Sequence, residues 1–218
     1  MALMKATEVP TDAVELSEVE ATAYAWDLVD DWDSLLDTWA LRYGSAFLGG
    51  INALTGIMIN RHYRRKLNLG TYGYFSSVIP ITVMPGILTA LFHRHSIATG
   101  MLLMKETCPV CYEVRSAVIQ LGLGIVYPMM LGPASALMFA HRYSTYRTPN
   151  LQEGPKVMFK FLNKLTKPFK GTIATLAVIQ FVASSAVTYF EMKNHMTMRR
   201  KMVEIENKMM REQGYKST

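Results

Sequence analysis

The amino-acid sequence predicts an all-α membrane protein with four transmembrane helices, an amphipathic N-terminal helix and a helical C-terminal tail. Three observations support this fold class: half of the 218 residues are hydrophobic, the mean hydropathy is positive, and the apolar residues lie in blocks separated by charged loops. A helix needs about 17–25 mostly apolar residues to cross a bilayer. Because four blocks approach this length, a soluble helical protein is disfavoured.

The apolar blocks divide the chain into three regions. We expect membrane spans over residues 44–60, 71–92, 114–140 and 171–189, together forming a four-helix bundle over residues 44–190. An acidic amphipathic segment, residues 1–43, precedes the bundle. A Met-rich charged helix, residues 191–218, follows it, with Met198, Met202, Ile205 and Met209 on one stripe.

The N-terminal segment contains ten acidic residues and two basic ones. Its apolar residues recur at helical spacing as Leu28, Trp32, Leu35 and Trp39, while Asp30, Asp33 and Asp37 share another face. This periodicity predicts one amphipathic helix from about residue 12 to residue 41. The helix is expected either to lie at the membrane edge or to bind a basic partner.

Basic residues are concentrated in two loops. Residues 61–70 contain four bases and no acid, and residues 141–170 contain seven bases against Glu153 alone. With four spans these two loops share one side, and positively charged loops favour the side from which the protein is inserted. The termini and the loop of residues 93–113 are therefore expected on the opposite side.

Small and polar residues recur at helical spacing within the expected spans. Asn52, Gly56 and Asn60 fall four residues apart in the first span, and Gly124 and Pro128 share a face of the third. Such stripes suit close helix packing in lipid, where an unpaired amide is costly. The spans have no Asp, Glu or Lys in their middle, so a small-solute carrier is the least favoured function.

A short helix between the third and fourth spans is predicted to be basic on one face. That face contains Lys156, Lys160, Lys164 and Lys167. Together with the bases of the first loop (Arg61, Arg64, Arg65 and Lys66), these lysines are candidates for binding anionic lipid or an acidic protein surface. A nucleic-acid fold is not indicated.

Cys108 and Cys111 are the two cysteines of the chain, and three interpretations of the pair remain open. The first is a structural disulfide in an oxidising compartment. The second is thiol redox catalysis, because a Cys-x-x-Cys pair that opens a helix favours a lowered thiol pKa. The third is a zinc site that includes His93 and His95, although the spacing matches no recognised finger. We expect no catalytic triad, metal or cofactor.

Three segments, taken in order, resemble the transmembrane protein 126 family. The first is the string from Gly56 to Asn68, with Arg64-Arg65 near its end. The second is the cysteine pair followed by Arg115-Ser116, Tyr127-Pro128 and Arg142-Tyr143, and the third is Thr166-Lys167-Pro168. The resemblance covers roughly residues 44–190.

The resemblance implies a non-enzymatic, multi-pass protein of the mitochondrial inner membrane that assists the assembly of respiratory complex I. One branch of the family anchors an intermediate assembly complex alongside ECSIT and an acyl-CoA-dehydrogenase-like factor, and another accompanies a distal part of the membrane arm. The cysteines would then face the intermembrane space, and Arg61, Arg64, Arg65 and Lys66 would meet matrix partners or cardiolipin. The alternative from another class is a membrane thiol oxidoreductase that uses Cys108 and Cys111.

Overall fold

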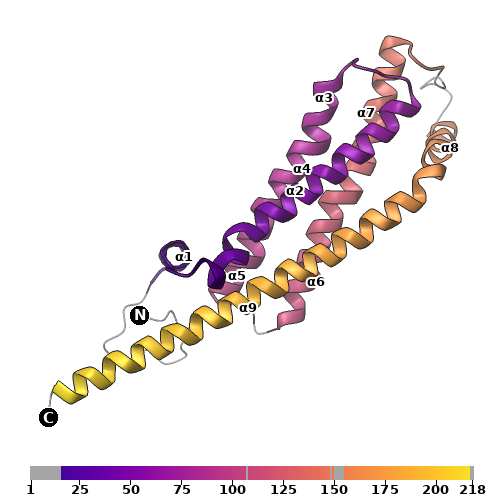
Figure 1. The fold of residues 1–218 in the computed structure, drawn as a ribbon. Coiled ribbons are helices and arrows are strands. Elements are labelled where there is room, and N and C mark those ends of the chain that lie inside the picture. Colours follow the sequence, from indigo (N-terminus) through magenta and orange to yellow (C-terminus); the bar gives the residue numbers. More distant parts are fainter. Residues whose placement is uncertain (1–15, 107, 148, 150–154, 217–218) are drawn as a thin grey trace.

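The chain forms an elongated helical bundle in a computed structural model that describes residues 16–106, 108–147, 149 and 155–216 (Figure 1). Within these residues no strand occurs, in agreement with the predicted all-α class. The helices include α1 (Glu18–Asp30), α2 (Leu35–Lys66), α8 (Pro155–Thr166) and α9 (Lys170–Lys216). A short 3-10 turn, η5 (Lys167–Phe169), joins α8 to α9.

Two composite segments complete the bundle. One contains α3 (Tyr74–Val78), η1 (Ile79–Val83), α4 (Met84–His93), η2 (Arg94–Ala98) and α5 (Thr99–Leu102). The other contains α6 (Pro109–Leu121), η3 (Gly122–Val126) and α7 (Tyr127–Tyr143). Since α2 packs against α4, α7 and α9, it is the helix around which the others are arranged.

Length and composition support three membrane-crossing segments among the described residues, and not the four expected. They are Tyr74–Leu102, Pro109–Tyr143 and Lys156–Glu212. The expected span at residues 44–60 lies inside α2, which does not meet this criterion. Polar residues at its packed face, including Asn52, Thr55 and Asn60, are buried against neighbouring helices and lower its hydropathy.

The expected single N-terminal helix is divided into two helices. Residues 12–15 lie outside the described residues, α1 begins after the capping residue Ser17, and the helical path breaks between Asp31 and Ser34. Aspartate and serine side chains compete for backbone hydrogen bonds and favour helix ends. The guanidinium of Arg42 fixes the break by donating to the carbonyl oxygens of Val29, Asp30 and Trp32.

Two of the π-helical turns among the described residues have their C-terminal capping residue immediately before a proline. The Met84 N–H donates to the Ile79 oxygen immediately before Pro85, and the Tyr127 N–H donates to the Gly122 oxygen immediately before Pro128. A proline has no N–H for the regular helical bond and its ring crowds the carbonyl four residues earlier. These two widened turns thus stand where a proline interrupts the regular bonding, whereas η2 forms without a proline.

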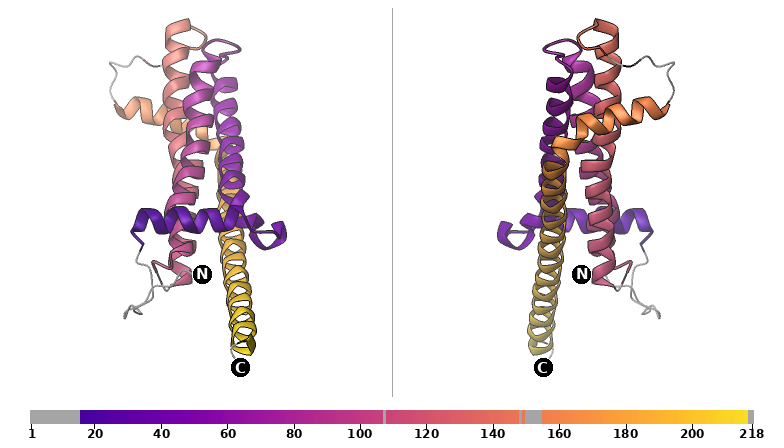
Figure 2. Two further views of the ribbon diagram at one scale, coloured as in Figure 1. Left: turned by 90° about the vertical axis from the view of Figure 1, so that its left-hand side faces the viewer. Right: turned by 90° about the vertical axis from the view of Figure 1, so that its right-hand side faces the viewer.

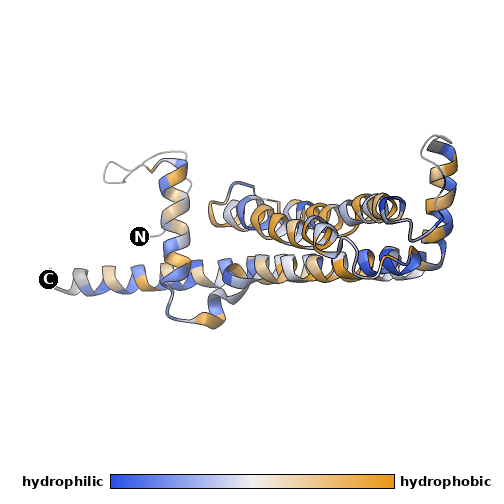
Figure 3. Ribbon diagram, turned by 90° about the horizontal axis from the view of Figure 1, so that it is seen from above, coloured by the Kyte–Doolittle hydropathy of each residue, from blue (hydrophilic) through white to orange (hydrophobic). Residues whose placement is uncertain are grey.

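The bundle presents different surfaces at its two ends. The loop between α2 and α3, the end of α7 and α8 gather at one end, whereas α1, the start of α6 and the end of α9 lie toward the other (Figures 1 and 2). The helix α1 lies across the second end, and α9 continues beyond it without a break at residue 190 (Figure 2). Apolar residues dominate the middle of the bundle, while α8 and the end of α9 alternate in character (Figure 3).

Candidate functional site

A hydrogen-bonded network lies in the middle of the bundle and consists of Asn52, Thr55, Thr89, Gln120 and Gln180. The Asn52 amide donates to Thr89 at 2.6 Å, and the Gln120 amide donates to Oδ1 of Asn52 at 3.1 Å. Gln120 also donates to Gln180, whose amide donates to Thr55 at 2.7 Å. Each residue is at most 3% exposed. Since buried amides need partners, the network fixes α2, α4, α6 and α9 relative to one another.

The small residues expected at helix contacts occupy close approaches. A Cβ atom on Gly124 would stand 2.1 Å from Oδ1 of Asn52, and one on Gly56 would stand 2.5 Å from the Ile81 carbonyl oxygen. Pro128 and Asn60 are buried as well. The structure therefore places all five of the expected packing residues inside the bundle.

A buried ionisable pair near the α1 end of the bundle was not expected from the sequence. Nε2 of His93 lies 2.9 Å from Oε2 of Glu191, and the hydroxyl of Ser116 lies 3.3 Å from Nδ1 of the same ring. None of the three is more than 1% exposed. The sequence contained a signal for it: Gln180, Ser184 and Thr188 recur at helical spacing, and Glu191 follows three residues after Thr188.

His93 is buried against Glu191 and Ser116, whereas the two cysteines are exposed. Cys108 and Cys111 are exposed free thiols, and Cys108 immediately precedes the first residue of α6, Pro109. Hydrogen bonds from the thiol and backbone N–H of Cys111 hold the pKa of the Cys108 thiol below its usual value. Among the described residues, no group of three or more His, Cys, Asp or Glu side chains is arranged to hold a metal ion.

The four bases at the end of α2 divide into one buried and three exposed side chains. Arg64 is 5% exposed and donates to the carbonyl oxygens of Gly70 and Tyr72, both at 2.8 Å. Its guanidinium therefore organises the loop between α2 and α3, where Gly70 has a positive φ of 51°. Arg61, Arg65 and Lys66 point outward and are exposed.

Two cavities lie on either side of Arg61 and Arg65, which are one helical turn apart. The first, about 640 Å³, is lined by both arginines and by residues that include Ile57, Tyr74 and Val78. The second, about 560 Å³, is also lined by both arginines, and its remaining lining residues are Met58, His62, Lys66 and Phe169. Each cavity thus combines cationic with apolar walls.

The connection before α9 is held against the same end of α2. The hydroxyls of Tyr63 and Thr166 are 2.7 Å apart, and the ring of His62 stacks on Phe169 with 4.1 Å between centroids. The lysines of α8 and η5 remain exposed: Lys156, Lys160, Lys164 and Lys167. The structure therefore brings together the segments around Tyr63 and Thr166, which are 103 residues apart in the sequence.

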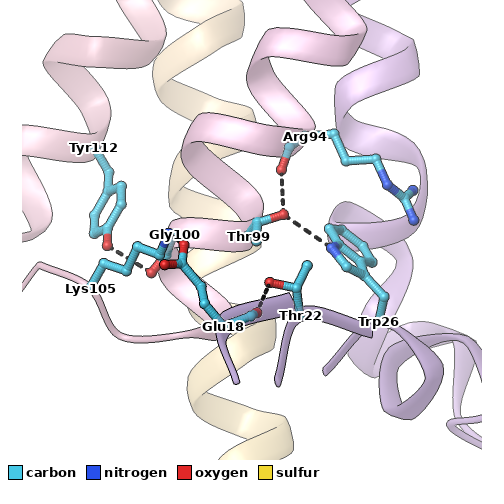
Figure 4. A network of polar contacts seen from close by, with 8 residues as sticks. All are labelled: Glu18, Thr22, Trp26, Arg94, Thr99, Gly100, Lys105 and Tyr112. Carbon is cyan, nitrogen blue, oxygen red and sulfur yellow. Dashed lines mark hydrogen bonds and ion pairs between the residues drawn. The ribbon is translucent and has the colours of Figure 1, made fainter. Parts of the chain in front are cut away.

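At the opposite end, α1 contacts η2, α5 and the loop that precedes the cysteines (Figure 4). The indole N–H of Trp26 donates to Thr99 at 3.0 Å, and the guanidinium of Arg94 lies 3.7 Å from the centre of the same indole. Glu18 forms an ion pair with Lys105. Part of the acidic N-terminal surface is thus used within the chain.

The sequence comparisons place the chain in a family. The sequence model of the family "Transmembrane protein 126" matches residues 32–208. Transmembrane protein 126 of Drosophila melanogaster is 40% identical over 210 residues, which cover 95% of this chain and 94% of that protein. The chain belongs to the transmembrane protein 126 family.

Mammalian members of the transmembrane protein 126 family are more distant from this chain. Transmembrane protein 126A of Mus musculus is 28% identical over 145 residues, covering 66% of this chain and 71% of that protein. The protein of the same name from Rattus norvegicus is 32% identical over 133 residues, covering 59% and 63%. No solved structure matches this chain. The family match includes the cysteine pair, both cavities and most of α9, and begins after α1.

Proposed function

We propose that this protein is a non-enzymatic scaffold of the mitochondrial inner membrane that supports assembly of the membrane arm of respiratory complex I. Membership of the transmembrane protein 126 family and the apolar helices support a multi-pass membrane protein. In the scaffold role, the helices of the bundle are held together by buried hydrogen bonds, and partner proteins bind the outer surfaces of the bundle.

One observation carries the partner-binding part of the proposal. The end of α9 runs past the bundle (Figure 2), and Ile205, Met209 and Met210 are each more than half exposed on it. Exposed apolar side chains on a projecting helix are typical of contact surfaces, and methionine adapts to irregular partners. The proposed occupant is a helix of an assembly factor or a nascent membrane-arm subunit.

We also propose that α2 crosses the membrane with the three apolar segments. Its outward face carries exposed apolar side chains at Phe47, Leu54, Ile57 and Met58, which suit lipid contact. Asn52 and Thr55 face the bundle, where the network provides hydrogen-bond partners for both side chains. Four crossings keep both termini and Cys108 on one side, opposite the basic loops.

The scaffold role is tested by affinity purification of the tagged protein from detergent-solubilised mitochondria, followed by mass spectrometry. We expect complex I membrane-arm subunits and assembly factors, including ECSIT, to be recovered with it. Recovery of none of these proteins would overturn the proposal. The double variant Ile205→Gln/Met209→Gln should lower recovery at least fivefold because it removes apolar contact area.

The matched control for the α9 surface is Glu204→Gln/Lys208→Gln. These positions have the same spacing on the same helix, both side chains are exposed, and the double change leaves the net charge unaltered. Normal recovery with the control and reduced recovery with the apolar variant would assign the contact to the apolar face. Equal recovery with both would locate the partner contact elsewhere.

A second candidate function, thiol oxidoreductase, is favoured by the exposure of both cysteines and the lowered pKa of Cys108. The double variant Cys108→Ser/Cys111→Ser separates the two functions. Loss of complex I at a normal level of the variant protein supports the oxidoreductase. Unchanged complex I supports the scaffold.

A further inference from the structure

We propose that the ridge formed by Arg61 and Arg65 is a binding site for a phospholipid headgroup that contains two phosphates. The ridge lies between the two cavities at the end of α2. One phosphate would lie on each side of it, and the acyl chains would follow the apolar walls toward the middle of the bundle. This inference does not depend on the proposed role in complex I assembly.

The lining of the cavities indicates an amphipathic anion. Neither lining contains Asp or Glu. Ile57 and Val78 form apolar parts of the first cavity, and Met58 and Phe169 form those of the second. A soluble anion would leave these apolar walls in contact with water, whereas a lipid covers them and places its phosphates at the basic rim.

The position of the ridge indicates a membrane interface. The apolar segment that begins at Tyr74 and the one that ends at Tyr143 have these ends close to α2. Tyr72 stacks on Tyr143 with 4.9 Å between ring centroids. Tyrosine and cationic side chains gather where the hydrocarbon region meets the headgroups.

Shared use of the two arginines indicates two linked phosphates. Arg61 and Arg65 line both cavities, so two anions bound there would be neighbours across one turn of α2. Among the described residues, neither arginine pairs with a carboxylate. A guanidinium has a planar set of donors that matches phosphate oxygens. The guanidinium of Arg64 already donates to the carbonyl oxygens of Gly70 and Tyr72. Arg64 therefore stabilises the wall of the first cavity and is not a ligand of the headgroup.

The experiment is a native mass spectrometry titration of the full-length protein in non-ionic detergent. The ligands are cardiolipin with two phosphates, phosphatidylglycerol with one, and inorganic pyrophosphate as a competitor without acyl chains. We expect cardiolipin to bind at least tenfold more tightly than phosphatidylglycerol. Binding of both lipids with equal affinity would overturn the two-phosphate assignment, and displacement of cardiolipin by millimolar pyrophosphate would overturn the lipid assignment.

The variant Arg61→Gln/Arg65→Gln should weaken cardiolipin binding about tenfold or more, because each base near a charged interface contributes about a fivefold effect. The matched control, Lys160→Gln/Lys164→Gln, removes two exposed bases at the same spacing from α8, which lines neither cavity at these positions. The affinity of this control variant for cardiolipin should change by less than threefold. Equal losses in both variants would show attraction to overall charge and overturn the site.

Folding of the variants is checked by thermal unfolding in detergent without added lipid. Both arginine side chains are exposed, so unfolding temperatures should match that of the unaltered protein. If the double variant is not recovered, Arg61→Gln and Arg65→Gln are titrated singly. A weakening of cardiolipin binding in each supports the site, and unchanged binding in both overturns it.

Discussion

Gly124 is required because there is no room for a side chain beside the buried amides. A methyl group at this position would approach Oδ1 of Asn52 to 2.1 Å and Nε2 of Gln180 to 2.8 Å. We therefore expect Gly124→Ala to lower the free energy of unfolding by about 1–3 kcal/mol, the usual cost of overpacking a core. Thermal or denaturant unfolding in detergent measures the difference.

Gly122 provides the control in the same π-helical turn. Nothing lies within 4 Å of a Cβ atom built there, so Gly122→Ala should be neutral or slightly stabilising because alanine favours helix. A Gly124→Ala protein as stable as Gly122→Ala would contradict the close approach.

Glu191 is expected to stabilise the bundle through His93. Removing one member of a buried, hydrogen-bonded pair costs about 3–5 kcal/mol, so Glu191→Ala should strongly lower the unfolding temperature. Glu191→Gln retains an acceptor for the imidazole and should cost less. The exposed Glu204 supplies the control variant Glu204→Ala, and equal unfolding temperatures for Glu191→Ala and Glu204→Ala would count against the pair.

The buried stripes could be predicted residue by residue, but their partners could not. Asn52 and Asn60 are spaced to share one face toward the interior of the bundle, and hydrocarbon surroundings require buried amides to be paired. Their pairing depends on how four helices are rotated about their axes. The same reason concealed the His93–Glu191 contact, whose members are 98 residues apart.

At the scale of elements, one ion pair joins the start of α2 to α9. Asp37 pairs with Lys201, and this hydrogen bond is the main reason that the pKa of Asp37 is lowered. Because the pKa of Asp37 is lower in the folded state, the ion pair stabilises the fold fully when the pH is above the ordinary aspartate pKa of about 4. The stabilisation is lost as the pH falls through the folded-state value.

We therefore expect the α2–α9 contact to loosen in acid. Hydrogen exchange at the backbone of residues 35–41 should increase as the pH is lowered below about 4, after correction for intrinsic exchange rates. In Lys201→Met the corrected exchange should already be high at neutral pH and should change less in acid. The same acid response in both proteins would contradict the assignment to this pair.

The helical periodicity of residues 28–39 correctly predicted helix, yet the single helix was wrong, and two of the four expected apolar-face residues, Leu35 and Trp39, are exposed. Asp31, Asp33 and Ser34 favour a helix end but do not by themselves determine where the helix ends. Arg42 decides for the break because its guanidinium bonds three carbonyl oxygens there. A local sequence pattern does not include the effect of a side chain ten or more residues away, so it could not predict this break.

For the whole molecule, the arrangement of ends predicts which groups share a side of the membrane. In mitoplasts, a membrane-impermeant maleimide should label Cys108 and Cys111 after mild reduction, without permeabilisation. In a Cys108→Ser/Cys111→Ser background, the cysteine introduced by Lys66→Cys should be labelled only after the inner membrane is permeabilised. The reverse pattern would invert the orientation, and labelling of both groups from one side would contradict the crossing of α2.

The sequence by itself determined the all-α membrane class, the approximate positions of the apolar segments and the family. Hydrophobic block length, helical spacing and ordered motifs are local properties, and they survive without knowledge of any contact. Tertiary structure decided that the polar face of α2 is buried, that Arg64 bonds loop carbonyls while Arg61 and Arg65 line both cavities, and that His93 bonds Glu191. These outcomes depend on distances between helices far apart in the chain, which no spacing along it fixes.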